Sequence, residues 1–127
     1  MPAYNVDQFD PPAPVASVIL RHPVTGASLS DVPMLIDSGA DVTLIPRKLI
    51  EKLELTPVTD KVYELQGFDG NTQLADVVQL DLVFLGKRFK GQFLVIDQPL
   101  GVLGRNVLNA VAILLNGPQL TWSEQLS

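Results

Sequence analysis

Residues 35–41 read Leu-Ile-Asp-Ser-Gly-Ala-Asp, an apolar pair followed by an acid, a small hydroxyl residue and glycine. The apolar pair predicts the end of a buried strand, so we expect Asp37 where that strand leaves the core. A carboxyl group at such a partly desolvated position is suited to acid–base chemistry. Gly39 allows the backbone to turn sharply and to approach a ligand closely. The alternative is an ordinary strand followed by a turn, which Asp-Ser-Gly also forms readily.

A second apolar stretch that ends in glycine favours the catalytic interpretation. Residues 36–46 read I-D-S-G-A-D-V-T-L-I-P, and residues 99–108 read P-L-G-V-L-G-R-N-V-L. Together these stretches resemble the two signature motifs of the retropepsins, the single-domain aspartic proteases of retroviruses and their cellular and bacterial relatives. The resemblance extends over roughly residues 15–115, and a Gly-containing hairpin at 66–70 has the position of the flap in those enzymes.

The composition limits the classes of protein to which the chain can belong. With 127 residues, of which 46% are hydrophobic and 18% charged, it is expected to form one globular domain. We expect an extended N-terminal arm over residues 1–14 and a retropepsin-like domain over residues 15–127. The net charge of −5 and the lack of a basic run argue against nucleic acid as a partner. No stretch approaches the ~20 apolar residues of a membrane span, so we expect no membrane partner within this chain.

The chain contains no cysteine and a single histidine, His22. Thiol catalysis, disulfides and thiolate metal sites are therefore excluded, and a Ser-His-Asp triad would have to use a histidine that we expect in a solvated turn. Aspartate and glutamate are the main candidates left for hydrolytic chemistry, and we expect no metal and no cofactor. The lack of cysteine and of an apolar secretory signal favours a cytoplasmic over a secreted location.

Short alternating apolar runs predict an all-β, compact, barrel-like fold with one or two short helices. We expect strands over 16–21, 28–36, 42–45, 61–66, 72–85, 88–95, 112–115 and 119–122, and helices over 47–53 and 105–109. In the long run 72–85, period-two alternation predicts that one set of side chains is buried, namely Leu74, Val78, Leu80, Leu82 and Phe84.

Aspartic protease chemistry needs two carboxyl groups that share a proton. One carboxylate takes a proton from the attacking water, and the other carboxylic acid donates to the substrate oxygen. Because the chain has a single Asp-Ser-Gly, the simplest arrangement is a homodimer with a two-fold axis between two copies of Asp37. Retropepsins are built in this way, so the resemblance implies the same acid-protease fold, active as a two-fold homodimer.

The resemblance also implies supporting roles for the neighbours of Asp37. The hydroxyl of Ser38 would cross the two-fold axis, and Gly39 would present its backbone to the substrate. Ala40 has no hydroxyl to donate to the carboxyl pair. Asp41 would form an ion pair with Arg105 in the second motif. The alternative is that these two charges lie unrelated on the surface, where a pair contributes only ~0–1 kcal/mol.

By position, two groups of residues are expected to bind the substrate. The flap tip would contribute Gly67, Phe68, Asp69 and Gly70. The apolar cleft walls would be formed by Leu35, Val42, Leu44, Pro99, Leu100 and Val102, and they would favour bulky hydrophobic side chains. The alternative for the wall residues is an ordinary core position. The expected flap has fewer glycines than retroviral flaps, and the chain continues beyond the second motif into an extra hairpin.

The leading interpretation is a homodimeric aspartic endopeptidase that acts on peptide or protein substrates. A second interpretation keeps the same fold as a catalytically silent peptide-binding or dimerisation module. A third is a structural β-domain in which the motifs match by chance.

Overall fold

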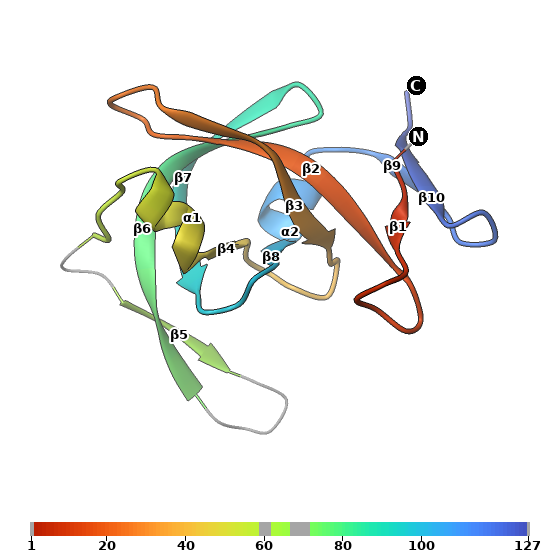
Figure 1. The fold of residues 1–127 in the computed structure, drawn as a ribbon, viewed down its shortest axis with the longest axis horizontal. Helices are drawn as coiled ribbons and strands as arrows, with labels where there is room; N and C mark the ends of the chain where they lie inside the picture. Colours follow the sequence, from red (N-terminus) through yellow and green to blue (C-terminus); the bar gives the residue numbers. More distant parts are fainter. Residues whose placement is uncertain (1, 59–61, 67–71, 127) are drawn as a thin grey trace.

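The computed structural model describes residues 2–58, 62–66 and 72–126, and strands make up about half of the chain (Figure 1). The elements in chain order are β1 (Tyr4–Asn5), β2 (Ala13–Arg21), β3 (Ser28–Ile36), β4 (Leu44–Pro46), α1 (Arg47–Lys52), β5 (Val62–Gln66), β6 (Thr72–Phe84), β7 (Lys87–Ile96), β8 (Gly101–Leu103), α2 (Arg105–Leu108), β9 (Ile113–Asn116) and β10 (Thr121–Glu124). The all-β class with short helices is therefore confirmed.

The main sheet closes into a barrel. Its strand order is β1-β2-β3-β8-β4-β7-β6-β5, and an additional antiparallel pairing between β2 and β6 joins the two sides. The β3–β8 and β4–β7 pairs are parallel, whereas the other neighbours are antiparallel. β5 and the first part of β6 form a hairpin that projects away from the barrel (Figure 1).

A tight turn joins β6 to β7, the longest antiparallel pair. Phe84 pairs with Lys87, and the two residues between them, Leu85 and Gly86, have φ values of 52° and 75°. Positive φ at both central positions is typical of the two-residue hairpin turn whose twist matches that of the strands. Glycine adopts this conformation without strain, whereas leucine does so at a cost.

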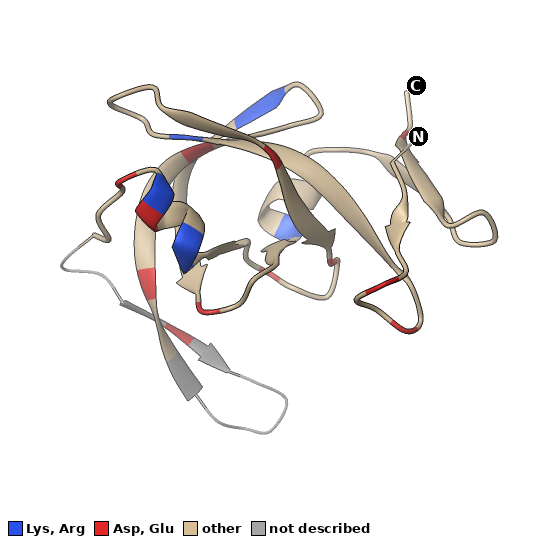
Figure 2. Ribbon diagram, viewed as in Figure 1, with Lys and Arg blue, Asp and Glu red and all other residues tan. Residues whose placement is uncertain are grey.

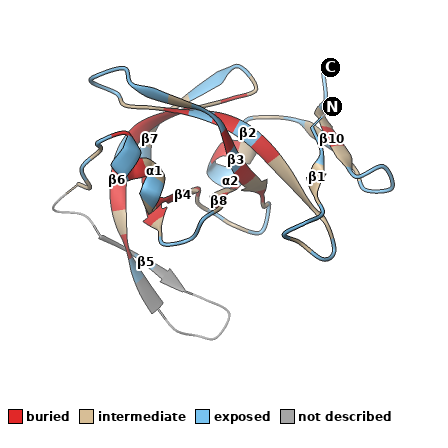
Figure 3. Ribbon diagram, viewed as in Figure 1, coloured by how far each residue is buried: buried red, intermediate tan, exposed pale blue. Residues whose placement is uncertain are grey.

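The barrel interior confirms the period-two pattern of β6 in its second half only. Val78, Leu80, Leu82 and Phe84 are all at most 1% exposed, and Figure 3 shows the buried positions along the barrel strands. The prediction for Leu74 is wrong, because this residue is 72% exposed. The first part of β6 lies outside the barrel, where it pairs with β5. In this part, the odd-numbered Ala75 and Val77 are buried and Leu74 of the predicted set is not. There, Ala75 and Val77 pack with Leu94 in a second, smaller cluster.

The N-terminal segment does not extend away from the domain. β1 pairs with the start of β2, Ala3 bridges to Thr121, and the backbone N–H of Tyr4 donates to Leu120. The two termini therefore lie together beside the β9–β10 hairpin (Figure 1). Trp122 in β10 is 2% exposed, and its indole Nε1 donates to the carbonyl of Val15 over 2.9 Å.

The charged residues are dispersed over the described part of the chain. Figure 2 shows the Lys and Arg positions spread over several elements, including α1, α2 and β7. Among the residues that the structure describes, the helices lack the length and the apolar character of a membrane-spanning helix.

Replacing Trp122 by phenylalanine tests the attachment of the C-terminal hairpin. We expect Trp122→Phe to lower the free energy of unfolding by about 2 kcal/mol, because it removes a buried hydrogen bond and leaves space beside Phe84. Unfolding in urea is monitored by circular dichroism at fixed protein concentration. Tryptophan fluorescence is unsuitable, because Trp122 is the only tryptophan and the variant lacks it. Leu114→Ala, at an exposed site in the same hairpin, is the control and should change little. Equal stability of both variants would contradict this attachment.

Candidate active site

The two sequence motifs lie on neighbouring parallel strands. Leu35 pairs with Val102 and Ile36 with Leu103, which places the end of β3 beside the end of β8. The backbone N–H of Asp37 continues this ladder by donating to the carbonyl of Leu103 over 3.1 Å. Asp37 is thus the first residue beyond β3, and its side chain is half-buried, as expected for a carboxyl at the edge of a core.

A tight turn orients the Asp37 carboxyl group. The backbone N–H of Gly39 donates to Asp37 Oδ1 over 2.9 Å, and the N–H of Ala40 donates to the Asp37 carbonyl over 3.2 Å. The turn is therefore an Asx turn, as its composition favours, and it uses only one of the two carboxyl oxygens. Asp37 Oδ2 has no hydrogen bond to a residue that the structure describes, so it remains available to a ligand or to a second carboxyl group.

A buried hydroxyl joins the loop after Asp37 to the second motif. Thr43 is fully buried, and its Oγ1 accepts the backbone N–H of Gly104 over 3.0 Å. The same hydroxyl donates to Asn106 Oδ1 over 2.6 Å. It therefore acts as acceptor and donor at once, which holds the start of α2 against the active-site loop. This contact was not predicted from the sequence, because a threonine in an apolar run is ordinarily part of a strand.

Gly104 is required by close packing rather than by its backbone angles. Its φ of −93° and ψ of −177° are open to any residue. A Cβ atom at this position, however, would lie 2.2 Å from the carbonyl oxygen of Val42. Backbone atoms cannot move aside as a flexible side chain can, so only glycine lets the two motifs approach this closely.

The predicted ion pair between Asp41 and Arg105 is wrong. Arg105 Nη1 instead donates to the carbonyl oxygen of Ser38 over 2.8 Å, and its backbone N–H donates to the carbonyl of Ala40 over 2.8 Å. The turn after Asp37 directs the carbonyl groups of Ser38 and Ala40 toward α2. Arg105 therefore donates its hydrogen bonds to these backbone oxygens and not to the Asp41 carboxylate. Arg105 therefore does connect the second motif to the active-site loop, while Asp41 is exposed.

An open cleft of about 940 Å³ lies next to this loop. Five of the predicted wall residues line it, namely Leu35, Leu44, Pro99, Leu100 and Val102. Val42 does not line it and packs against the small cluster of Ala75, Val77 and Leu94. Asp37 lies outside the lining itself, two residues beyond Leu35. The predicted flap-tip residues Gly67, Phe68, Asp69 and Gly70 lie outside the described residues.

The cleft also contains residues that the sequence did not indicate. Gln8 and Phe9 of the N-terminal segment, the exposed Leu74 of β6, and the charged residues Arg47 and Asp97 contribute to its walls. Gln8, Phe9 and Leu74 come from segments far from both motifs, so no local pattern pointed to them. Arg47 and Asp97 flank the two motifs, but nothing in the sequence showed that they meet. For Leu74 the sequence pointed the other way, because the alternation along residues 72–85 predicted a buried position.

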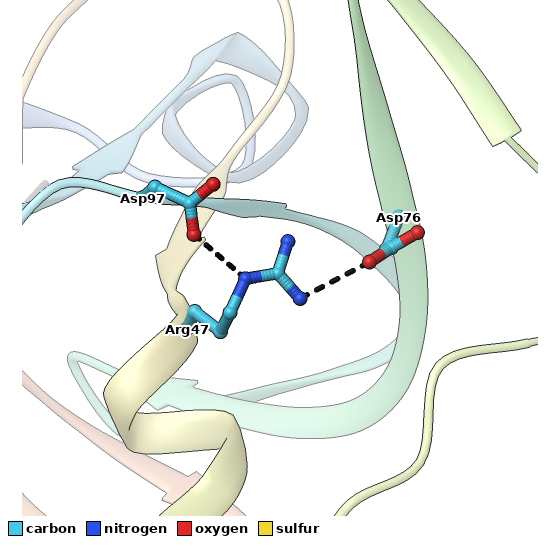
Figure 4. Close-up of polar contacts among 3 residues, drawn as sticks. All are labelled: Arg47, Asp76 and Asp97. Atoms are coloured by element: carbon cyan, nitrogen blue, oxygen red, sulfur yellow. Dashed lines mark hydrogen bonds and ion pairs between the residues drawn. The ribbon is translucent and has the colours of Figure 1, made fainter.

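Arg47, which lines the cleft, bridges two carboxylates (Figure 4). Its Nε donates to Asp97 Oδ1 over 2.6 Å, and its Nη1 donates to Asp76 Oδ2 over 3.1 Å. The hydrogen bond to Asp97, followed by that to Asp76, raises the pKa of Arg47 above its usual value. Within residues 2–58, 62–66 and 72–126, these are the only side-chain ion pairs, and no group of three or more His, Asp or Glu residues could hold a metal ion.

Comparisons with known proteins agree with this geometry. A family model described as aspartyl protease matches residues 23–107, a range that contains Asp37 and most of the second motif. Among solved structures, the chain is similar to EIAV protease complexed with the inhibitor HBY-793. The TM-score is 0.58 and the sequence identity is 21%, over 84% of this chain and 91% of that chain. At this identity, the similarity concerns the fold.

Removing the Thr43 hydroxyl tests its role at this site. We expect Thr43→Val to lower the free energy of unfolding by about 2–3 kcal/mol, because it leaves the Gly104 N–H and the Asn106 side chain without their partner. Thr121→Val is a matched control, since the buried Thr121 hydroxyl has no partner in the described residues. Its stability should be unchanged or slightly raised. Urea unfolding of both variants is the measurement, and equal destabilisation would contradict the role of Thr43.

Proposed function

Because this chain belongs to the aspartyl protease family and has a retropepsin-like fold, we propose that it is an aspartic endopeptidase active as a homodimer. Two Asp37 carboxyl groups, one from each protomer, activate the water that hydrolyses the peptide bond. The observation that carries the proposal is the state of Asp37: one carboxyl oxygen is held by Gly39, and the other is available beside an open cleft.

The homodimer follows from the stoichiometry of the chemistry. The mechanism uses two carboxyl groups, and the chain has one Asp-Ser-Gly stretch. A two-fold axis next to the active-site loop brings two copies of Asp37 together. The half-buried Asp37 and the exposed Ser38 support this arrangement, because an active-site loop left open in one chain can be covered by a second. The Ser38 hydroxyl then lies close enough to the axis to contact the partner loop.

The proposed reaction divides the work between the two carboxyl groups. The ionised carboxyl takes a proton from water while the water oxygen attacks the peptide carbonyl carbon. The protonated carboxyl donates to the carbonyl oxygen, which gives a tetrahedral intermediate. Breakage of the C–N bond then releases the amine, which takes up the proton that the first carboxyl removed from water. A hydroxyl proton of the intermediate returns to the second carboxyl, so that the new acid product forms and the pair regains its starting state. Gly39 contributes by its small size, since a Cβ atom there would lie 3.1 Å from Asp37 Oδ1.

The cleft supports a preference for hydrophobic residues in the substrate. Leu35, Leu44, Leu100 and Val102 offer apolar surface on one side of Asp37, and Leu74 adds to it from β6. Apolar pockets with a few polar groups bind extended ligands by burying their side chains. We therefore propose that bulky apolar side chains flank the scissile bond, and that Asp41 and Arg105 support the loop without contacting them.

Replacing the proposed catalytic acid tests the function. Asp37→Asn keeps the shape and the hydrogen bond from Gly39, but it removes the ionisable group. We expect the variant to fold normally and to reduce hydrolysis of a mixed peptide library to background, measured by mass spectrometry of the products. Glu124→Gln, at an exposed acid of β10 that does not line the cleft, is the control and should retain activity. Turnover by Asp37→Asn at the wild-type rate would refute the mechanism, and peptide binding without any wild-type turnover would favour a silent binding module.

Mixing the two forms tests the homodimer. If each active site needs two intact copies of Asp37, an excess of Asp37→Asn chains captures wild-type chains in inactive dimers. In about a ninefold excess of variant, activity per wild-type chain should fall to about a tenth. Sedimentation equilibrium of the same mixtures gives the fraction of dimer. Activity that depends only on the amount of wild-type chain would show that one chain acts alone.

A further inference from the structure

Arg47 links segments that lie far apart in the sequence. It is the first residue of α1 and follows directly on Pro46 of β4. Its two carboxylate partners are 29 residues away, at Asp76, and 50 residues away, at Asp97. Figure 4 shows the guanidinium between the two acids, one on β6 and the other beyond the end of β7. One rigid, planar group thus holds two separate segments of chain.

Asp76 marks the point where the β5–β6 hairpin joins the barrel. It pairs with Val62 in the last pair of the hairpin, while the next residue, Val77, already pairs with Leu94 of β7. A contact at this junction is placed where it can set the angle at which the hairpin leaves the barrel. Leu74, two residues before Asp76, lines the cleft, so this angle also places one wall of the cleft.

Asp97 marks the start of a second segment that lines the cleft. It follows Ile96, which pairs with Pro46, and it opens the loop that carries Pro99 and Leu100 into the cleft. This loop has no regular secondary structure between β7 and β8. Its position therefore depends on side-chain contacts, and the Arg47–Asp97 pair is the shorter of the two contacts that Arg47 makes.

The exposure of the three side chains suits a role in positioning rather than in stability. The side chains of Arg47, Asp76 and Asp97 are 37%, 43% and 79% exposed, so water and salt screen both ion pairs. Such pairs add little to the stability of the barrel. They can, however, bias the position of a hairpin and a loop, which need much less free energy to move than a packed core.

We propose that Arg47 is a positioning residue that couples the β5–β6 hairpin to the loop after β7 and so sets the width of the cleft. With Arg47 in place, both walls are held on one guanidinium. Without it, the walls separate, because Asp76 and Asp97 are left as like charges without a shared counter-charge. The coupling itself is independent of the proposed function, and only its effect on substrate binding rests on that function.

Distance measurements between the two walls test the coupling directly. The chain has no cysteine, so spin labels can be attached at Glu64→Cys in β5 and Gln98→Cys in the loop. Both positions are exposed. Labelled chains are mixed with a large excess of unlabelled chains so that only distances within one chain are recorded. We expect a narrow distance distribution with Arg47 and a broader one, shifted to longer distance, in Arg47→Gln.

Two further variants separate the coupling from a general effect on the helix. Lys52→Gln removes the same charge from the last turn of α1, and it should leave the distribution unchanged. Asp97→Asn cuts only the link to the loop, and it should broaden the distribution while the urea unfolding midpoint stays unchanged. A distribution that is the same in Arg47→Gln, Asp97→Asn and the parent protein would overturn the proposal, as would equal broadening by Lys52→Gln.

Kinetics gives the consequence for substrate binding. We expect Arg47→Gln to raise KM by about three- to tenfold with little change in kcat, since the carboxyl groups of Asp37 are untouched. Arg47→Lys keeps the charge but not the planar guanidinium, so its KM should lie between the values of the wild type and of Arg47→Gln. An unchanged KM together with a lower kcat would contradict the positioning role. Absence of any hydrolysis would count against the proposed function and leave the distance test intact.

Discussion

The parallel pairing of β3 with β8 is the contact on which the site depends. It joins residues more than sixty positions apart and ends with the Asp37 N–H on the carbonyl of Leu103. This register brings the loop after Asp37 against the start of α2. Three further contacts then become possible: the Thr43 hydroxyl reaches Gly104, Arg105 reaches Ser38, and the backbone of Val42 packs on Gly104. None of them can form if the two strands are shifted by one residue.

The barrel and the cleft are stabilised by interactions of different strength. The barrel rests on buried apolar side chains such as Leu80, Leu82 and Leu103, whose burial is costly to reverse. The cleft walls rest on a hairpin outside the barrel and an irregular loop, linked by exposed ion pairs of Arg47. A rigid floor that holds Asp37 is thus combined with walls that can adjust to a ligand at low cost. Such a division is consistent with the peptide substrate that we propose.

Local patterns were sufficient for much of the fold and for the position of the central acid. The bounds of β3 agree with the expected strand over 28–36, because alternation along that strand matches a single buried face. α1 begins where Pro46 and the spacing of apolar residues predicted it. The same reasoning failed for Leu74. Along a long strand, the set of side chains that is buried can switch to the other face where the strand changes its pairing partner. β1 and β8 were missed because strands of two or three residues carry no recognisable period.

The sequence by itself determined the strand pattern, the two motifs and the isolated acid at Asp37, all of which depend on residues close together in the chain. The tertiary structure alone decided that Arg105 binds the Ser38 carbonyl instead of Asp41, that Thr43 is shared between Gly104 and Asn106, and that Arg47 joins Asp76 to Asp97. The physical reason is that a donor takes the nearest well-oriented acceptor in space. Which acceptor is nearest depends on the register of strands that are paired across most of the chain.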